Sequence, residues 1–182
     1  MTQIREHYGR NADVFEGKVL SVPSDAWDQL SPCPQWSARD VVQHIADSSG
    51  MFLGWVDLSI PEGPSAADDP AQLWRNTRSA VETALEDEDA ATTVLERTMA
   101  TQTFADFVDQ YLAFDLVVHA WDLARAAGVD DELSPQVLPD ALKRARETAE
   151  LGRTMGAFGP EVIVDESADD QTKLLALVGR TR

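Results

Sequence analysis

The chain is poor in cysteine and in basic residues, and both deficits limit what it can be. Its 182 residues include one cysteine, Cys33, so no disulfide can form within the chain. The 15 Lys and Arg residues stand against 32 Asp and Glu, which gives a formal net charge of −17. Nucleic acids and anionic membrane surfaces are bound through clustered Lys and Arg. We therefore expect no nucleic-acid partner and no membrane partner.

Long hydrophobic runs are also missing. No apolar stretch is long enough to span a bilayer, and the segment from Met1 to His7 contains no apolar signal core. We therefore predict a cytoplasmic protein. The hydrophobic fraction of 43% is nevertheless sufficient for a core, and 182 residues suit a single domain.

Capping signals and apolar spacing predict an all-α chain. Apolar residues recur at helical spacing in five segments. The segments Ser37–Asp40 and Thr103–Asp106 have the capping-box pattern. Asp69-Pro70 supplies an N-cap followed by a proline at the first helical position. The predicted helices cover residues 3–21, 37–60, 70–89, 103–128 and 134–151.

The simplest packing of these helices is a four-helix bundle with an additional C-terminal helix or tail. We predict one domain over residues 1–182, with a core over about 1–155 and an extension over 156–182. Residues 90–101 are rich in Thr and Val, which favours an extended segment.

Three polar residues share one face of the predicted helix over residues 103–128. Asp115, His119 and Asp122 follow one another at spacings of four and three residues, among mostly apolar neighbours. Such groups are costly in an apolar helix unless they are paired or bind a metal. His44 lies in a similar setting in an earlier helix, and two His with one carboxylate can hold a divalent metal with an open position. Two core histidines satisfied by backbone carbonyls or carboxylates fit the spacing equally well.

Three segments, taken in order, resemble a known family. They are Cys33-Pro-Gln-Trp36-Ser-Ala-Arg-Asp-Val-Val-Gln-His44, then Asp115-Leu-Val-Val-His119-Ala-Trp-Asp122-Leu-Ala-Arg-Ala-Ala-Gly128, and the ending between Phe158 and Arg180. They resemble the DinB-like proteins, and are closest to the mycothiol-dependent maleylpyruvate isomerase N-terminal domain branch. The ending is similar to a subfamily of largely uncharacterised actinobacterial proteins. The resemblance implies a DinB-like four-helix bundle with a divalent metal at one end of its core.

The resemblance also implies a ligand set. In the isomerase the metal is held by a His on the second helix and by a Glu and a His four residues apart on a later helix. His44, Asp115 and His119 match these positions, with Asp115 where the isomerase has Glu. Asp122 is the alternative third ligand, or a residue that orients His119. Imidazole suits zinc or nickel better than magnesium.

Two classes of function follow from the resemblance. The first is a metal-dependent thiol transferase or isomerase that uses mycothiol or another small thiol, with a metal-assisted hydrolase as its nearest variant. The second is a non-catalytic helical binding or stress-related module with a structural or vestigial metal site. The isomerase has an additional C-terminal domain for which we expect no room in this chain, so we do not carry its isomerisation over. The sequence leaves open whether the chain forms a homodimer.

Two further residues have competing interpretations. Cys33 would be a reactive nucleophile only with a neighbour that lowers the pKa of its thiol, and its place between Pro32 and Pro34 favours a packed turn instead. His7 follows Glu6 near the start of the chain, and we expect it to be an exposed helix residue.

Overall fold

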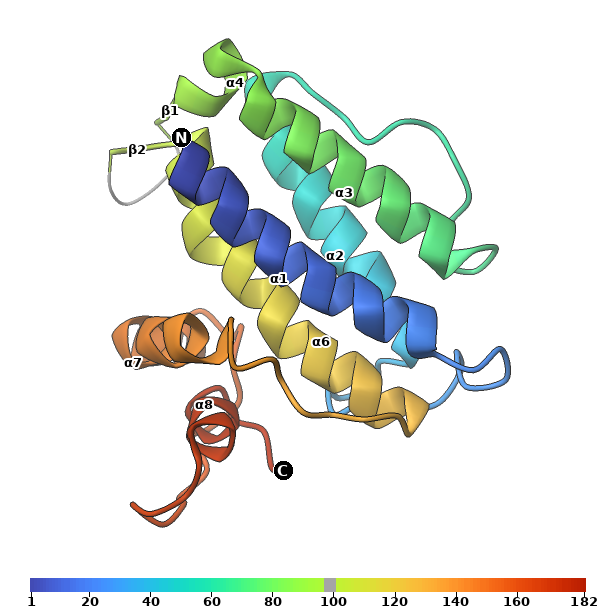
Figure 1. Ribbon diagram of the computed structural model, residues 1–182, viewed down its shortest axis with the longest axis vertical. Helices are drawn as coiled ribbons and strands as arrows, with labels where there is room; N and C mark the ends of the chain where they lie inside the picture. The colour runs from blue at the N-terminus through green and yellow to red at the C-terminus, as the bar shows by residue number, and fades with distance from the viewer. Residues whose placement is uncertain (97–100) are drawn as a thin grey trace. The chain divides into compact units, whose positions relative to one another are not determined.

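Four long helices lie side by side in the computed structural model, which describes residues 1–96 and 101–182 (Figure 1). They are α1 (Thr2–Ser21), α2 (Ala38–Leu53), α3 (Pro70–Glu86) and α6 (Ala113–Ala127). Helices α1 and α2 each pack against both α3 and α6. This is the arrangement of a four-helix bundle, and the all-α prediction is confirmed.

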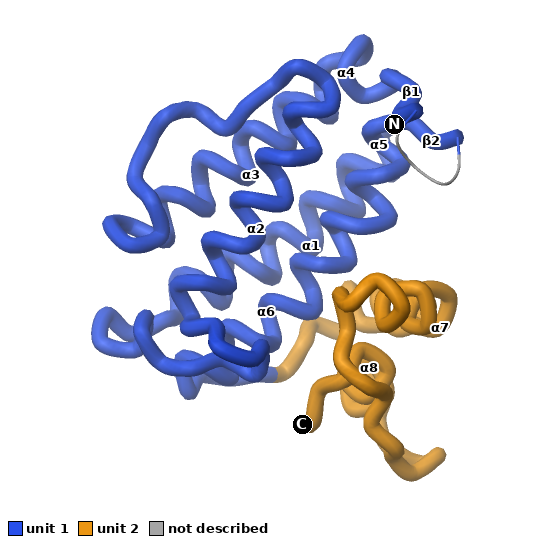
Figure 2. The backbone as a smooth tube through the Cα atoms, turned by 180° about the vertical axis from the view of Figure 1, so that it is seen from behind, with its two compact units in different colours: residues 1–131 blue, residues 132–182 orange. Residues whose placement is uncertain are grey.

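The chain divides into two compact units, Met1–Asp131 and Glu132–Arg182 (Figure 2). The bundle belongs to the first unit. The second unit contains α7 (Leu138–Thr154) and α8 (Asp170–Leu177), which pack against each other. No helix among the described residues combines the length and the apolar character needed to cross a membrane.

The predicted helix starts are confirmed for α2 and α3 and wrong for α7. Ser37 and Asp40 form the capping box of α2, and Asp69 accepts a hydrogen bond at the start of α3. In the second unit, α7 begins at Leu138 rather than near residue 134. The carbonyl of Ser134 accepts the amide N–H groups of Val137 and Leu138, so a turn precedes the helix.

The predicted continuous helix over residues 103–128 is wrong in its middle. It consists of α5 (Phe104–Phe107), the π-helix η2 (Val108–Leu112) and α6. Thr103 and Asp106 cap α5 as predicted, and Gly128 ends α6 in the left-handed region with φ 65°. A π-helical segment inserts one extra residue into the turn, which changes the face that the preceding residues present.

Helix α1 contacts this irregular region through two polar side chains. Asn11 Nδ2 donates a 2.8 Å hydrogen bond to the carbonyl of Ala113, and His7 Nδ1 lies 2.7 Å from Asp109 Oδ1. Asn11 is buried and His7 is half-buried. Our expectation that His7 is an exposed helix residue was therefore wrong. Nothing in the sequence signalled the contact with Asp109, which is 102 residues away.

Short elements connect α3 to α5. They are α4 (Glu88–Thr92), β1 (Val94–Leu95) and β2 (Gln102–Thr103), and the two strands pair antiparallel. The extended segment predicted over residues 90–101 is thus confirmed at β1 and wrong at α4, while residues 97–100 lie outside the described part of the chain. After α2 a short 3₁₀-helix, η1 (Gly54–Val56), ends the predicted second helix before residue 60.

Large apolar side chains fill the bundle. Each fully buried one of this size contributes about 1.5–3 kcal/mol relative to an exposed position. Those on the four long helices include Phe15, Ile45, Trp74, Leu116 and Trp121. Within this apolar bundle, α6 also buries His119 and Asp122, which are two of the six polar or charged residues found buried among the described residues.

Candidate metal centre

Two histidines and a carboxylate meet where α2 packs against α6. His44 comes from α2, and Asp115 and His119 come from α6. His44 Nε2 lies 3.2 Å from Asp115 Oδ2, and His119 Nε2 lies 3.3 Å from Asp115 Oδ1. The structure therefore brings together the three residues that the sequence predicted as a ligand set.

The donor atoms fit a zinc-like ion in type and spacing. Nitrogen and carboxylate ligands bind such ions at about 2.0–2.2 Å, so neighbouring ligands of a tetrahedral site lie about 3.3 Å apart. Each histidine approaches a different oxygen of Asp115 at close to this separation, and one donor atom from each of the three residues lies within 4.8 Å of the others. Three such ligands leave a coordination position open.

The second ring nitrogen of His119 faces a different pair of residues. His119 Nδ1 lies 2.9 Å from Asp122 Oδ2, although the direction of the contact falls outside ordinary hydrogen-bond geometry. The thiol of Cys33 donates a 3.2 Å hydrogen bond to the same Asp122 oxygen. Asp122 was the alternative ligand in the sequence, and the structure places it behind His119 rather than beside His44.

Cys33, His119 and Asp122 are thus a second group with the residue types of a metal site. The two groups share His119 but differ in access to solvent. The side chains of His44 and Asp115 are 31% and 28% exposed, whereas that of Asp122 is fully buried and Cys33 is 8% exposed. The group on the Nε2 side of His119 is therefore the more exposed of the two, and the group on the Nδ1 side the more buried.

The loop before α2 supplies an aromatic wall for the first group. The Trp36 ring centroid is 4.7 Å from that of His44 and 5.9 Å from that of His119. The loop turns sharply here: Trp36 N–H donates to the Cys33 carbonyl, and Gln35 adopts φ 69°. Proline at the second position and a positive φ at the third are typical of a type II turn. The packed turn expected around Cys33 is confirmed.

Electrostatic coupling shifts the pKa values of His119 and Asp115 in opposite directions. Desolvation lowers the pKa of the His119 ring, but attraction to Asp115 and hydrogen bonding outweigh it and raise that pKa well above 6.5. Desolvation raises the pKa of Asp115, but attraction to His119 and hydrogen bonds from both histidines outweigh it, so the pKa of this carboxyl falls below its ordinary value. The two groups therefore form an ion pair near neutral pH when no cation replaces the proton.

Sequence reasoning missed two contacts at this site. It did not link Trp36 to the histidines, and it did not connect Cys33 to Asp122. The two partners are 89 residues apart. The only local signal was that Cys33 and Trp36 share one tight turn just before the helix that carries His44.

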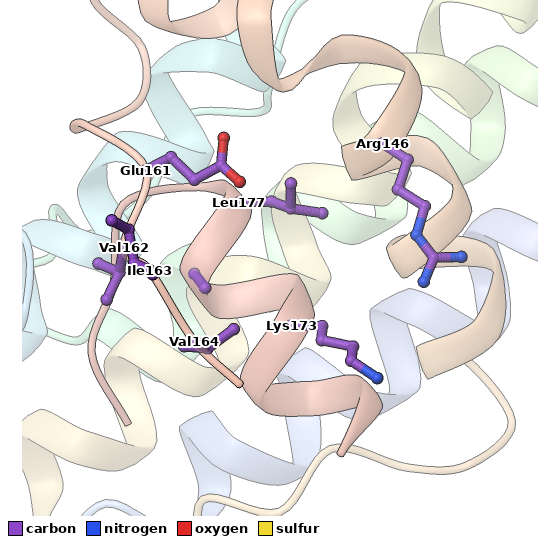
Figure 3. Close-up of a pocket in the computed structure, with 8 residues that line it drawn as sticks. Arg146, Glu161, Val162, Ile163, Val164, Lys173 and Leu177 are labelled. Atoms are coloured by element: carbon purple, nitrogen blue, oxygen red, sulfur yellow. The ribbon is translucent and has the colours of Figure 1, made fainter. Parts of the chain in front are cut away.

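A separate surface pocket of about 280 Å³ lies in the second unit (Figure 3). Arg146, Lys173 and Glu161 supply its charged groups, and its other lining residues are apolar. It contains no His or Cys, so it offers neither an imidazole ligand nor a thiol.

The bundle and its partly buried histidine–carboxylate cluster define a helical protein with a candidate site for a divalent metal. The family model described as Mycothiol maleylpyruvate isomerase N-terminal domain matches residues 9–124. The chain therefore belongs to this branch of the DinB-like proteins. All the cluster residues, from Cys33 to Asp122, lie within the matched range.

Relatives and a solved structure agree with this membership. Two uncharacterized Mycobacterium tuberculosis proteins, Rv0738 of strain ATCC 25618 / H37Rv and MT0763 of strain CDC 1551 / Oshkosh, are each 23% identical over 137 residues, or 75% of this chain and 74% of theirs. The crystal structure of a His-to-Ala mutant of mycothiol-dependent maleylpyruvate isomerase has the same fold, with a TM-score of 0.60 at 15% identity. That likeness covers 100% of this chain and 81% of the other. Residues 132–182 thus fall within the likeness. The length of this chain is therefore no reason to exclude the C-terminal part of the isomerase from the comparison.

Proposed function

We propose that this chain binds a divalent metal, zinc or nickel, through His44, Asp115 and His119, and uses it in a thiol-dependent transfer or isomerisation. The observation that carries the proposal is the convergence of these three donors, one atom of each lying within 4.8 Å of the others, which is compact enough for one ion to be bound by all three. Asp115 contributes one methylene less than Glu, and its carboxylate still reaches both histidines.

The chain's own residues suit this role in three ways. Asp115 carries a negative charge that balances part of the charge of a cation. Trp36 lies close to both imidazole rings and supplies an apolar wall beside them. Partial exposure of His44 and Asp115 leaves a path to the open side. A bound metal would lower the pKa of a thiol or a water at the open position, and so supply a nucleophile at neutral pH.

The family supports a small thiol as the co-substrate. Its name refers to mycothiol, and the solved structure is of a mycothiol-dependent isomerase. We therefore propose mycothiol or a related low-molecular-weight thiol, acting on a small electrophilic molecule. An acidic chain of net charge −17 gives no electrostatic attraction to nucleic acid.

A second candidate function has one observation in its favour. The two histidines and Asp115 already contact one another without any cation, so the cluster can satisfy its own polar groups. In that case the chain is a helical binding or stress-related module whose cluster is structural. This candidate predicts no metal in the purified protein.

Elemental analysis of protein purified without chelators, or with zinc or nickel added back, separates the two. We expect close to one ion per chain and a rise in the thermal midpoint on metal addition. His7→Gln is the matched control, because it removes a half-buried histidine that pairs with Asp109 in another part of the bundle. His119→Gln should lose the ion and His7→Gln should keep it. Absence of both zinc and nickel from the protein contradicts the proposal. If a metal is present, thiol consumption with a panel of electrophiles then tests for transferase activity.

A further inference from the structure

The buried thiol of Cys33 has no role in the metal site as described so far. It belongs to the loop before α2, donates to Asp122, and takes no part in the group formed by His44, Asp115 and His119. Cys33 is 8% exposed and Asp122 is fully buried. A buried carboxylate is costly unless hydrogen bonds satisfy it, so each donor that Asp122 receives matters for its position.

The three residues form a chain of contacts from the loop to the metal side. Cys33 Sγ lies 3.2 Å from Asp122 Oδ2, and the same oxygen lies 2.9 Å from His119 Nδ1. The opposite nitrogen, His119 Nε2, is the one that faces Asp115. A carboxylate this close to Nδ1 favours keeping a proton on that nitrogen, so Nε2 is the ring nitrogen from which a metal would displace a proton.

We propose that Cys33 is a positioning residue, whose thiol holds Asp122 so that His119 presents Nε2 to the metal. The effect on metal binding rests on the proposed metal site. The contacts among Cys33, Asp122 and His119 do not depend on that proposal. Asp122 Oδ2 contacts both Cys33 Sγ and His119 Nδ1. A shift of the thiol therefore changes the position of the carboxylate, and with it the orientation of the His119 ring.

The same turn couples two sides of the site. The turn from Cys33 to Trp36 is closed by the Trp36 N–H bond to the Cys33 carbonyl, and Ser31 Oγ accepts the Cys33 N–H at 3.2 Å. Trp36 rests on both imidazole rings in front, and Cys33 reaches Asp122 behind His119. One turn therefore lies next to the His119 ring through Trp36 and reaches its Nδ1 edge through Asp122.

Cys33 itself is a poor candidate for a direct ligand. Its sulfur is on the closed Nδ1 side, together with the fully buried Asp122. A metal there would occupy the space in which Sγ, Oδ2 and Nδ1 now contact one another. Thiolate ligation nevertheless has a spectroscopic signature, so the test can detect it.

The test uses the full chain loaded with Co²⁺, and compares Cys33→Ala and Cys33→Ser with the unmodified protein. Serine can donate the same hydrogen bond to Asp122, whereas alanine cannot. We expect Cys33→Ala to weaken Co²⁺ affinity by about tenfold, at the lower end of the range for residues that support a ligand. Cys33→Ser should restore most of that loss. Cys33→Ala should add little to Asp122→Asn, because both act through one path.

Two further readouts distinguish this inference from the proposed function. In metal-free protein, the ¹⁵N NMR shift of His119 Nδ1 should move in Cys33→Ala and return in Cys33→Ser, whether or not the chain binds metal. Thr77→Ala, a buried change in α3, is the control for a general loss of packing and should leave the shift in place. An unchanged shift in Cys33→Ala overturns the positioning role, as does a thiolate-to-cobalt charge-transfer band in the unmodified protein. If the NMR shift responds as expected but the chain does not bind Co²⁺, the proposed function is overturned and the positioning role of Cys33 is not.

Discussion

Asp122 Oδ2 lies 2.9 Å from His119 Nδ1, on the side of the ring opposite to Asp115. The spacing of three residues on α6 places the two side chains next to each other, and the burial of both removes competition from water. This relationship supports our proposal that Asp122 orients His119 and that Asp115 is the third ligand.

Substitutions of Asp122 and of His119 should therefore reduce metal affinity by different amounts. Asp122→Asn keeps the shape of the side chain but loses its charge, and we expect metal affinity to fall by about 10–100-fold. His119→Ala deletes a ligand and should cost more than about 100-fold, beyond the range for supporting residues. Competition titration against a chromophoric chelator measures both.

Asp115→Glu should keep metal binding, because glutamate supplies the same carboxylate on a side chain one methylene longer. Asp115→Asn should weaken it strongly, since the amide provides no negative charge. The reverse order, with Asp122→Asn abolishing binding and Asp115→Asn leaving it intact, would assign the third ligand to Asp122.

Much of the bundle could be predicted from local signals. The caps at Ser37, Asp69 and Thr103 fixed the helix starts in this unit, and the spacing of Asp115 and His119 placed them on one face of α6. These signals involve residues within one or two helical turns of each other, so they can be recognised without knowledge of the fold.

Other features depend on contacts between distant segments. The π-helical turn η2 contains neither Gly nor Pro, and it lies beside Asn11 and His7 of α1. The bond from Cys33 to Asp122 joins a loop to a helix 89 residues later. Neither could be inferred from periodicity, because only the packed bundle brings the partners together.

Removing the metal should lower stability without unfolding the chain. The bundle has an apolar core that needs no cation, unlike a zinc finger. After chelation, circular dichroism should retain most of the helical signal while the thermal midpoint falls. Loss of nearly all helix would instead make the metal part of the folding nucleus.

Asn11→Ala should destabilise the bundle by about 1–3 kcal/mol, the typical cost of leaving a buried polar group without its partner. Asn11 Nδ2 donates to the carbonyl of Ala113, two residues before Asp115, so metal affinity should fall as well if this bond holds the start of α6 in place. Urea denaturation measures the first effect. Gln72→Ala, which removes a half-buried hydrogen bond to Asn76 on α3, is the control and should leave metal affinity unchanged.

The metal-free protein and the metal complex should respond to pH in opposite ways. The pKa of His119 is raised in the folded state, so its stabilising contribution is complete below its unfolded value of about 6.5 and is lost as pH rises through the folded value. The pKa of Asp115 is lowered, so its contribution is present above about 3.8 and is lost as pH falls further. The pair thus stabilises the metal-free protein most between about pH 4 and 6.5.

Metal binding must displace the proton on His119, so affinity should rise by about tenfold per pH unit until the pH passes the folded pKa of His119. Calorimetric titrations of zinc in buffers of different ionisation enthalpy should show release of close to one proton per ion near neutral pH. His7→Gln should leave this proton count unchanged, because His7 pairs with Asp109 and not with the cluster. Zinc affinity that does not depend on pH between 6 and 8 would show that zinc does not displace the proton of the His119–Asp115 pair. His119 would then be removed from the ligand set.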